Sequence, residues 1–182
     1  MAVESTTPGI DRLPDLDLPD LDGTPTSLRQ IAADRPTVIV FACNHCPYVR
    51  SIEEPLGELA RAYADVRWLA ICSNDTSAYP DDDVPGLREQ VARARWDFPY
   101  LIDSDQQAAR SFGAACTPDF FVFGTNGQLV YRGAMDDARP RQPQPVDGAH
   151  LRDAINAARE DRTFDGGKPA MGCGIKWRSN DA

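Results

Sequence analysis

Residues 37–48 read Thr-Val-Ile-Val-Phe-Ala-Cys-Asn-His-Cys-Pro-Tyr, and the rest of the fold can be inferred from them outward. The first half of this segment is apolar and rich in β-branched residues, which is typical of a buried strand. Apolar residues then recur every three or four positions, which predicts a helix over about 46–64, kinked at Pro55. A Cys-x-x-Cys pair, Cys43 and Cys46, therefore lies on the turn from a buried strand into a helix.

This turn favours a reactive thiolate. Free backbone N–H groups and the helix dipole favour negative charge at a helix start, so we expect a lowered pKa at Cys43. We predict that Cys43, as the more exposed sulfur, attacks and that Cys46 resolves the mixed disulfide. His45 has two interpretations: an imidazolium that stabilises the thiolate, or a neutral ring that faces solvent.

Metal binding offers two competing interpretations of the pair. Cys-x-x-Cys is half of many zinc sites, but the other three cysteines are single and far apart in the sequence. A Cu(I) site on Cys43, Cys46 and His150 is the second alternative, because soft thiolates suit Cu(I). We favour redox chemistry over both, and expect neither a metal nor a cofactor.

A second motif lies at residues 116–119, Cys-Thr-Pro-Asp, ahead of an apolar run at 120–123. Together with the strand, the Cys-x-x-Cys and the proline-containing helix, it resembles the thioredoxin superfamily. The resemblance implies an α/β fold with a central mixed sheet flanked by helices. It also implies a cis peptide between Thr117 and Pro118, which faces the two cysteines and shapes a groove where a substrate chain pairs.

Four motifs resemble a peroxiredoxin-like branch of the redoxins, near the alkyl hydroperoxide reductase/thiol-specific antioxidant family. They are Cys-Asn-His-Cys-Pro-Tyr at 43–48, Cys-Thr-Pro-Asp-Phe at 116–120, Tyr-Arg-Gly at 131–133 and Gly-Cys-Gly-Ile-Lys-Trp at 172–177. The resemblance implies an N-terminal hairpin and an insertion before the cis-proline strand. It also offers Arg132 as a cation that would activate a peroxide.

The chain divides into three predicted parts. Residues 1–14 are polar and contain two prolines, which indicates a flexible N-terminal arm. We expect one redoxin domain over 15–162, which opens with a short hairpin at 16–24 and a helix at 27–33. Residues 163–182, rich in glycine and lysine, form a C-terminal tail.

The middle of the chain carries the insertion. A strand is predicted at 66–72, a solvated acidic loop at 74–83 and a helix at 84–94. An extended piece at 96–102 precedes a helix that opens with the capping-box pattern of Ser104 and Gln107 and ends at Gly113. Gly-Thr-Asn-Gly at 124–127 predicts a hairpin, and a last helix follows, with Asp147 as a candidate cap.

Composition excludes several classes of function. A chain of 182 residues with 42% hydrophobic and 26% charged residues is typical of one globular domain. The net charge of −9 argues against nucleic acid or an anionic membrane as a partner. Five cysteines without a recognisable export signal fit a reducing compartment, so we expect a cytoplasmic location.

We therefore predict a thiol–disulfide oxidoreductase, reduced by a thioredoxin or glutathione system, whose substrate is a protein or small-molecule disulfide. A peroxidase is the alternative, although the hydroxyl that orients peroxide is absent at both Val40 and Cys43. Asn44 and Tyr48 are candidate donors in its place. No acid precedes the cysteines in the strand, so no base for the resolving step is identified. Cys116 is either a further redox thiol or a small side chain packed behind the loop. Cys173 is either a further redox thiol or a solvated thiol on the tail. The oligomeric state stays open.

Overall fold

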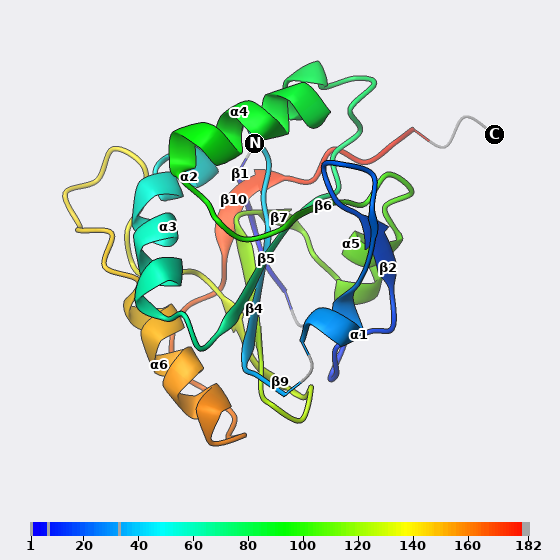
Figure 1. The fold of residues 1–182 in the computed structure, drawn as a ribbon. Helices are drawn as coiled ribbons and strands as arrows, with labels where there is room; N and C mark the ends of the chain where they lie inside the picture. Colours follow the sequence, from blue (N-terminus) through cyan, green and yellow to red (C-terminus); the bar gives the residue numbers. More distant parts are fainter. Residues whose placement is uncertain (1, 7, 33, 180–182) are drawn as a thin grey trace.

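A five-stranded mixed sheet forms the centre of the molecule, with strand order β6-β5-β4-β8-β9 (Figure 1). The computed structural model describes residues 2–6, 8–32 and 34–179. β4 is parallel to β5 and antiparallel to β8, while β5–β6 pair in parallel and β8–β9 antiparallel. The bounds are β4 Thr37–Phe41, β5 Arg67–Cys72, β6 Tyr100–Ile102, β8 Asp119–Phe123 and β9 Leu129–Gly133. The predicted central mixed sheet is confirmed.

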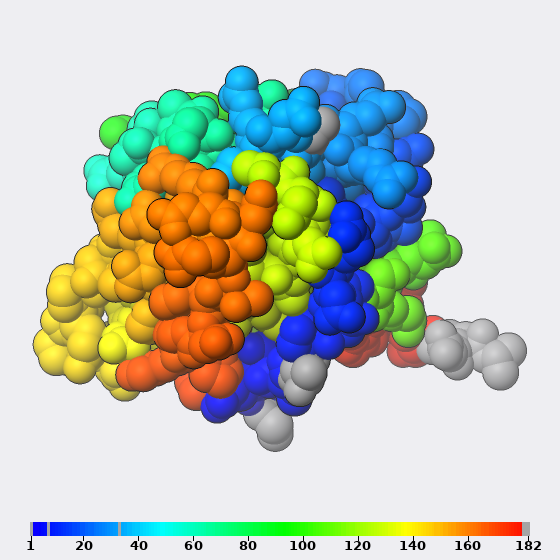
Figure 2. Space-filling view, turned by 90° about the horizontal axis from the view of Figure 1, so that it is seen from below, coloured from blue at the N-terminus to red at the C-terminus, as the bar shows by residue number. Residues whose placement is uncertain are grey.

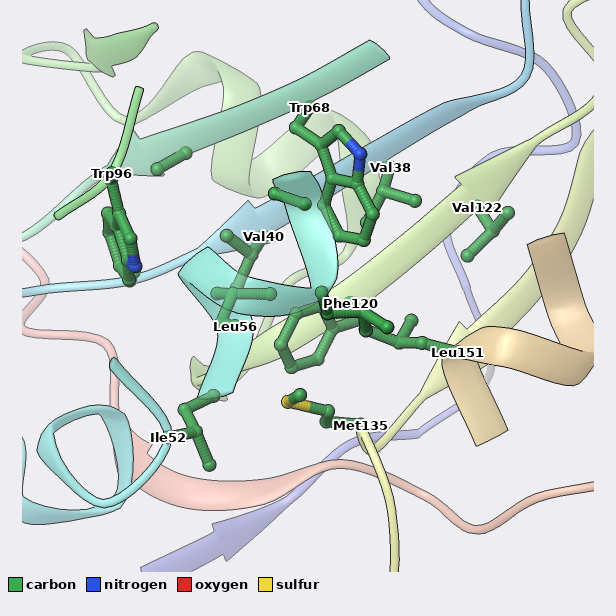
Figure 3. Packing of buried hydrophobic residues seen from close by; sticks show 14 of the residues in the cluster. Val38, Val40, Ile52, Leu56, Trp68, Trp96, Phe120, Val122, Met135 and Leu151 are labelled. Atoms are coloured by element: carbon green, nitrogen blue, oxygen red, sulfur yellow. The ribbon is translucent and has the colours of Figure 1, made fainter. Parts of the chain in front are cut away.

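Helices cover both faces of this sheet, as predicted. α3 (Glu53–Ala62) and α6 (Ala149–Arg159) lie on one face, and α4 (Val84–Ala94) packs against α3 (Figure 1). α1 (Leu28–Ile31) and α5 (Gln107–Phe112) cover the other. Each face of the sheet carries a hydrophobic core, and β4 contributes to both because the side chains of a strand alternate between faces. Figure 3 shows the α3/α6 side, where Val38, Val40 and Phe120 meet Leu56 and Leu151.

The helix after the cysteines is divided in two, which corrects the prediction of one kinked helix over 46–64. α2 covers only Pro47–Arg50, and α3 begins at Glu53 after Ile52, whose φ of −115° breaks the regular geometry. Pro55 consequently lies in the first turn of α3. A proline there breaks no helical hydrogen bond, because the first N–H groups of a helix have no intrahelical partner.

The N-terminal hairpin and the insertion are both present. β2 (Asp17–Pro19) pairs with β3 (Pro25–Ser27), and Ser27 caps α1; the predicted end of that helix, Ala33, is outside the described residues. The 3-10 helix η1 (Pro80–Asp82), α4, β6 and α5 lie between β5 and the cis-proline. The capping box at Ser104 is wrong: the carboxylate of Asp103 instead accepts hydrogen bonds from the first turn of α5.

Both ends of the chain form strands, where we expected a loose arm and a tail. β1 (Ala2–Glu4) and β7 (Cys116–Thr117) pair antiparallel with the two edges of β10 (Met171–Gly174). Ser5 also exchanges two hydrogen bonds with Ala170. Figure 2 shows the dark-blue N-terminal segment against the orange-red C-terminal residues. These short segments are ordered because each satisfies the backbone groups of the other.

Candidate active site

Cys43 and Cys46 lie in the turn between β4 and α2, and both cysteines are fully buried. The peptide between Thr117 and Pro118 is cis, as predicted. Thr117 contacts both cysteines: its hydroxyl lies 3.5 Å from Cys43 Sγ and its carbonyl oxygen 3.1 Å from Cys46 Sγ. The structure therefore brings together the two motifs that the sequence keeps far apart.

Of the two sulfurs, Cys46 is the one whose pKa is lowered, the reverse of the predicted assignment. A hydrogen bond from Cys43 lowers the pKa of Cys46 to about 5, aided by Thr117, the backbone of Val49 and Cys173. The same hydrogen bond and burial raise the pKa of Cys43. Cys46, not Cys43, is also the N-cap residue of α2. Both cysteines are equally buried, so the expectation that Cys43 is the more exposed sulfur is wrong, and its pKa shifts in the direction opposite to the predicted one.

Asp82 is the buried acid that sequence reasoning missed. Its Oδ1 accepts hydrogen bonds from the N–H groups of Asn44 (2.8 Å) and His45 (3.2 Å). Its Oδ2 lies 2.7 Å from His45 Nδ1 and accepts from the Asn74 amide at 2.8 Å. The acidic run at 81–83 was expected to be a solvated loop, yet Asp82 is only 1% exposed. No local pattern distinguishes it from its two neighbours.

The ion pair of Asp82 and His45 follows from these contacts. Burial alone would raise the pKa of Asp82, but hydrogen bonds from His45 and Asn74 hold that pKa below its usual value. The hydrogen bond to Asp82 raises the pKa of His45. The ring also stacks on Tyr79, with ring centroids 5.5 Å apart. Of the two interpretations of His45, the geometry favours the imidazolium.

A second polar network holds the loop from behind. The Gln90 amide donates to the carbonyl of Cys43 and to Glu53, both at 3.1 Å. Arg93 bridges Glu53 and the side chain of Asn44 at 2.7–2.8 Å. Asn44 therefore positions the loop through its side chain. Glu53, in the first turn of α3, belongs to this network.

The remaining cysteines differ from one another. Cys116 is fully buried, and burial followed by the charge of Asp119 raises its pKa, which indicates a packed, unreactive thiol. Cys173 is half-buried on β10 and packs against the core cluster that contains Cys43 and Cys46; burial, followed by its proximity to Cys46, raises its pKa. The structure thus brings Cys173 to the site and leaves Cys116 behind it.

Arg132 does not reach the cysteines, so its predicted role as a peroxide-activating cation is wrong. Its guanidinium pairs with Asp119 at 2.7 Å and donates to the carbonyl oxygens of Thr6 and Gly113. It lies over the ring of Phe121, which belongs to the core on the α1/α5 face, whereas Cys43 and Cys46 belong to the opposite core. The arginine is committed to a buried ion pair.

The ligand set expected for Cu(I) does not assemble. Among the described residues, Cys43, His45 and Asp82 bring their ligand atoms within 4.8 Å of one another. His150 is instead hydrogen-bonded to Asp137 at 2.9 Å. A hard carboxylate already engaged by several N–H groups is a poor match for Cu(I), which prefers thiolates.

Fold and site together define a thioredoxin-fold protein with a thiol redox function. The chain belongs to the AhpC/TSA family, whose family model matches residues 10–132. No curated protein matches the sequence. In the parts of the chain that the structure describes, no helix has the length and apolar character to traverse a bilayer.

Solved structures extend the match over the whole chain. It is similar to an uncharacterized conserved protein from Geobacillus kaustophilus, with 38% identity, coverage of 98% and 97% of the two chains and a TM-score of 0.90. It is also similar to a hypothetical protein from Sinorhizobium meliloti 1021, with 36% identity, coverage of 97% of this chain and 99% of the other, and a TM-score of 0.92. A secreted Mycobacterium tuberculosis disulfide oxidoreductase homologous to Escherichia coli DsbE shares 17% identity, with coverage of 79% of this chain and 96% of the other and a TM-score of 0.62. This likeness shows the fold alone.

Proposed function

We propose that this protein is a thiol–disulfide oxidoreductase that cycles Cys43 and Cys46 between dithiol and disulfide, with Cys46 as the attacking sulfur. One observation carries the proposal. Cys43 and Cys46 lie together at the turn from β4 into α2, both sulfurs contact Thr117 of the cis Thr117–Pro118 peptide, and the pKa of Cys46 is lowered to about 5. A thiolate with a thiol in contact can form and resolve a mixed disulfide within one site.

The first step uses the Cys46 thiolate. It attacks one sulfur of a disulfide substrate, a bond forms between that sulfur and Cys46, and the other substrate sulfur leaves as a thiolate that takes up a proton. Cys46 then no longer carries the negative charge that holds the proton on Cys43. The pKa of Cys43 therefore falls just when Cys43 is needed.

The second step releases the product. Cys43 loses its proton and attacks Cys46, the Cys43–Cys46 disulfide forms, and the second substrate sulfur leaves as a thiol. The proton of Cys43 passes to the departing substrate sulfur. The imidazolium of His45, held by Asp82 and within 4.8 Å of Cys43 Sγ, stabilises the negative charge on Cys43 as it forms.

A peroxidase is the second candidate, and one observation favours it. Both cysteines are fully buried, so a hydroperoxide enters more readily than a protein disulfide. The Thr117 hydroxyl, 3.5 Å from Cys43 Sγ, places beside the pair a hydroxyl of the kind that the Cys46 motif itself lacks. Against this, Arg132 is committed to Asp119 on the other face. Stabilising the charge of a departing hydroxide requires donors or cations around it.

A side-by-side assay separates the candidates: insulin disulfide reduction and hydrogen peroxide consumption, both driven by dithiothreitol. We expect disulfide turnover to exceed peroxide turnover. Cys46→Ser should abolish both activities, and Cys116→Ser serves as the control for a cysteine outside the pair. Faster peroxide consumption that is lost in Cys46→Ser would show that the protein is a peroxidase.

The partners follow from the chemistry. The oxidised site must be reduced by an external dithiol, so we propose a thioredoxin or glutathione system as the donor. A protein or small-molecule disulfide is the acceptor, and the cytoplasm is the proposed compartment, because free thiols persist there.

A further inference from the structure

β10 places a third thiol against the reactive pair. Cys173 pairs in register with Thr117, and Gly174 with Cys116, so β10 occupies the backbone edge just before the cis-proline. Cys173 packs against the core cluster that contains Cys43 and Cys46, and the carbonyl oxygen of Thr117, its partner in the register, lies 3.1 Å from Cys46 Sγ. Cys43 and Cys46 are fully buried, whereas Cys173 is half-buried. Of these three cysteines, Cys173 is the one that an external molecule can reach.

The segment that carries Cys173 is held on both sides. A Cβ on Gly172 would overlap the carbonyl oxygen of Thr117, so the two backbones are in direct contact there. Before it, Ala170 is bonded to Ser5. Beyond it, the N–H of Lys176 donates to the side chain of Asn74 at 2.9 Å. Cys173 is thus a positioned side chain and not a thiol on a frayed end, which was the alternative interpretation of the sequence.

We infer that Cys173 is a relay thiol through which an external thiol reductant re-reduces the buried Cys43–Cys46 disulfide. The inference rests on the proposed function. The Cys173 thiolate attacks Cys46 Sγ, so the Cys46–Cys173 disulfide forms, the Cys43–Cys46 bond breaks, and Cys43 leaves as a thiolate that takes up the proton lost by Cys173. No electrons are gained or lost in this exchange.

The external reductant completes the cycle. Its thiolate attacks Cys173 Sγ, a mixed disulfide forms at Cys173, and Cys46 leaves as a thiolate. A second thiol of the reductant then attacks the mixed disulfide, releases the oxidised reductant and restores the Cys173 thiol. In total, two external thiols become one disulfide and the protein regains its dithiol.

Access and leaving-group ability favour attack at the same sulfur. Attack on Cys173 expels Cys46, whose pKa in the dithiol form is lowered to about 5 chiefly by the Cys43 thiol, and that thiol has been re-formed in the preceding exchange. A thiol of lower pKa leaves faster in disulfide exchange. The half-buried position of Cys173 points the same way.

Peptide mapping after stoichiometric oxidation with diamide tests the inference directly. In the unmodified protein we expect a mixture of two singly oxidised forms, one with the Cys43–Cys46 disulfide and the other with Cys46–Cys173. Cys43→Ser should give Cys46–Cys173 and Cys173→Ser should give Cys43–Cys46, while Cys116→Ser, the matched control, should leave the original map unchanged. If the Cys43–Cys46 disulfide forms but the Cys46–Cys173 disulfide appears neither in the unmodified protein nor in Cys43→Ser, the relay is wrong and the proposed function stands. If Cys43–Cys46 never forms, the proposed function itself fails.

A kinetic comparison tests the relay without relying on the Cys43 variant. The oxidised protein is reduced with a reduced thioredoxin or with dithiothreitol, and the ratio of the two rates is measured. Because a bulky reductant depends on the accessible sulfur, Cys173→Ser should lower this ratio at least about tenfold. An unchanged ratio in Cys173→Ser, with the ratio also unchanged in Cys116→Ser, would overturn the relay.

Discussion

Cys46 shows how one neighbouring atom sets the chemistry of a residue. Its sulfur is buried, which by itself opposes a negative charge, yet hydrogen bonds that start with the one from Cys43 outweigh burial and lower the pKa to about 5. The partner thiol is the larger influence, because a buried charge depends on the donors that contact it directly.

Removing that partner should therefore change Cys46 more than any other substitution of a cysteine. In Cys43→Ala we expect the pKa of Cys46 to rise toward that of a free cysteine, because the strongest donor to the thiolate is lost. The rate of alkylation by iodoacetamide as a function of pH measures it. Cys116→Ala, which removes a thiol that is not among the donors to Cys46, should leave the profile unchanged; the same profile in Cys43→Ala would contradict the assignment.

Asp82 is the residue whose loss should cost most stability at the site. Asp82→Asn keeps the shape but replaces an acceptor that serves Asn44, His45 and Asn74, so we expect about 2–4 kcal/mol of destabilisation. The pKa of His45 should fall toward its ordinary value. Urea unfolding and nuclear magnetic resonance titration of the ring measure the two effects. The exposed neighbour supplies the control: Asp81→Asn should change neither.

At the scale of elements, the strands and helices with strong local patterns were predictable. Residues 37–41 alternate between two cores, and the turn at 124–127 has the glycines that a hairpin needs. The pairing of β1, β10 and β7 was not predictable, because it joins short segments that are far apart in the sequence. The role of Asp82 was not predictable either, because it contacts a residue 38 positions earlier and both of its neighbours in the sequence are also aspartates.

β10 offers a prediction with a control in the same strand. Gly172→Ala should displace β10, because the added methyl group would overlap the Thr117 carbonyl oxygen. Alkylation of Cys46 by a bulky maleimide should then become faster. In Gly174→Ala the nearest atom is a methyl group of Val3, at 3.1 Å, which can give way. Equal rates in the two variants would show that β10 does not cover the site.

The whole molecule should report the state of its thiols through its stability. Cys46 has a folded pKa of about 5, below the value of about 8.5 for a free thiol, so its contribution is present above the unfolded pKa and is lost as pH falls through the folded one. His45 acts in the opposite sense: its folded pKa is raised, so its contribution is lost as pH rises through that value.

Comparing reduced and oxidised protein isolates the thiols, because His45 is present in both. Between about pH 5 and 8.5 we expect the unfolding free energy of the reduced form to rise relative to the oxidised form, by at most about 1.4 kcal/mol per pH unit. Denaturant unfolding at several pH values measures it. If the difference in unfolding free energy between the reduced and oxidised forms does not change with pH, or if reduced Cys46→Ser shows the same pH dependence as the reduced unmodified protein, the low pKa does not belong to Cys46.

The sheet formed by β1, β10 and β7 also fixes when the site is completed during synthesis. Cys43, Cys46 and the cis-proline segment leave the ribosome well before residues 171–174, which supply the strand that pairs with Thr117. Chains fold from the N-terminus as they emerge. The nascent protein therefore passes through an interval in which its most reactive sulfur lacks its cover, and cellular oxidants and chaperones meet it first in that open form.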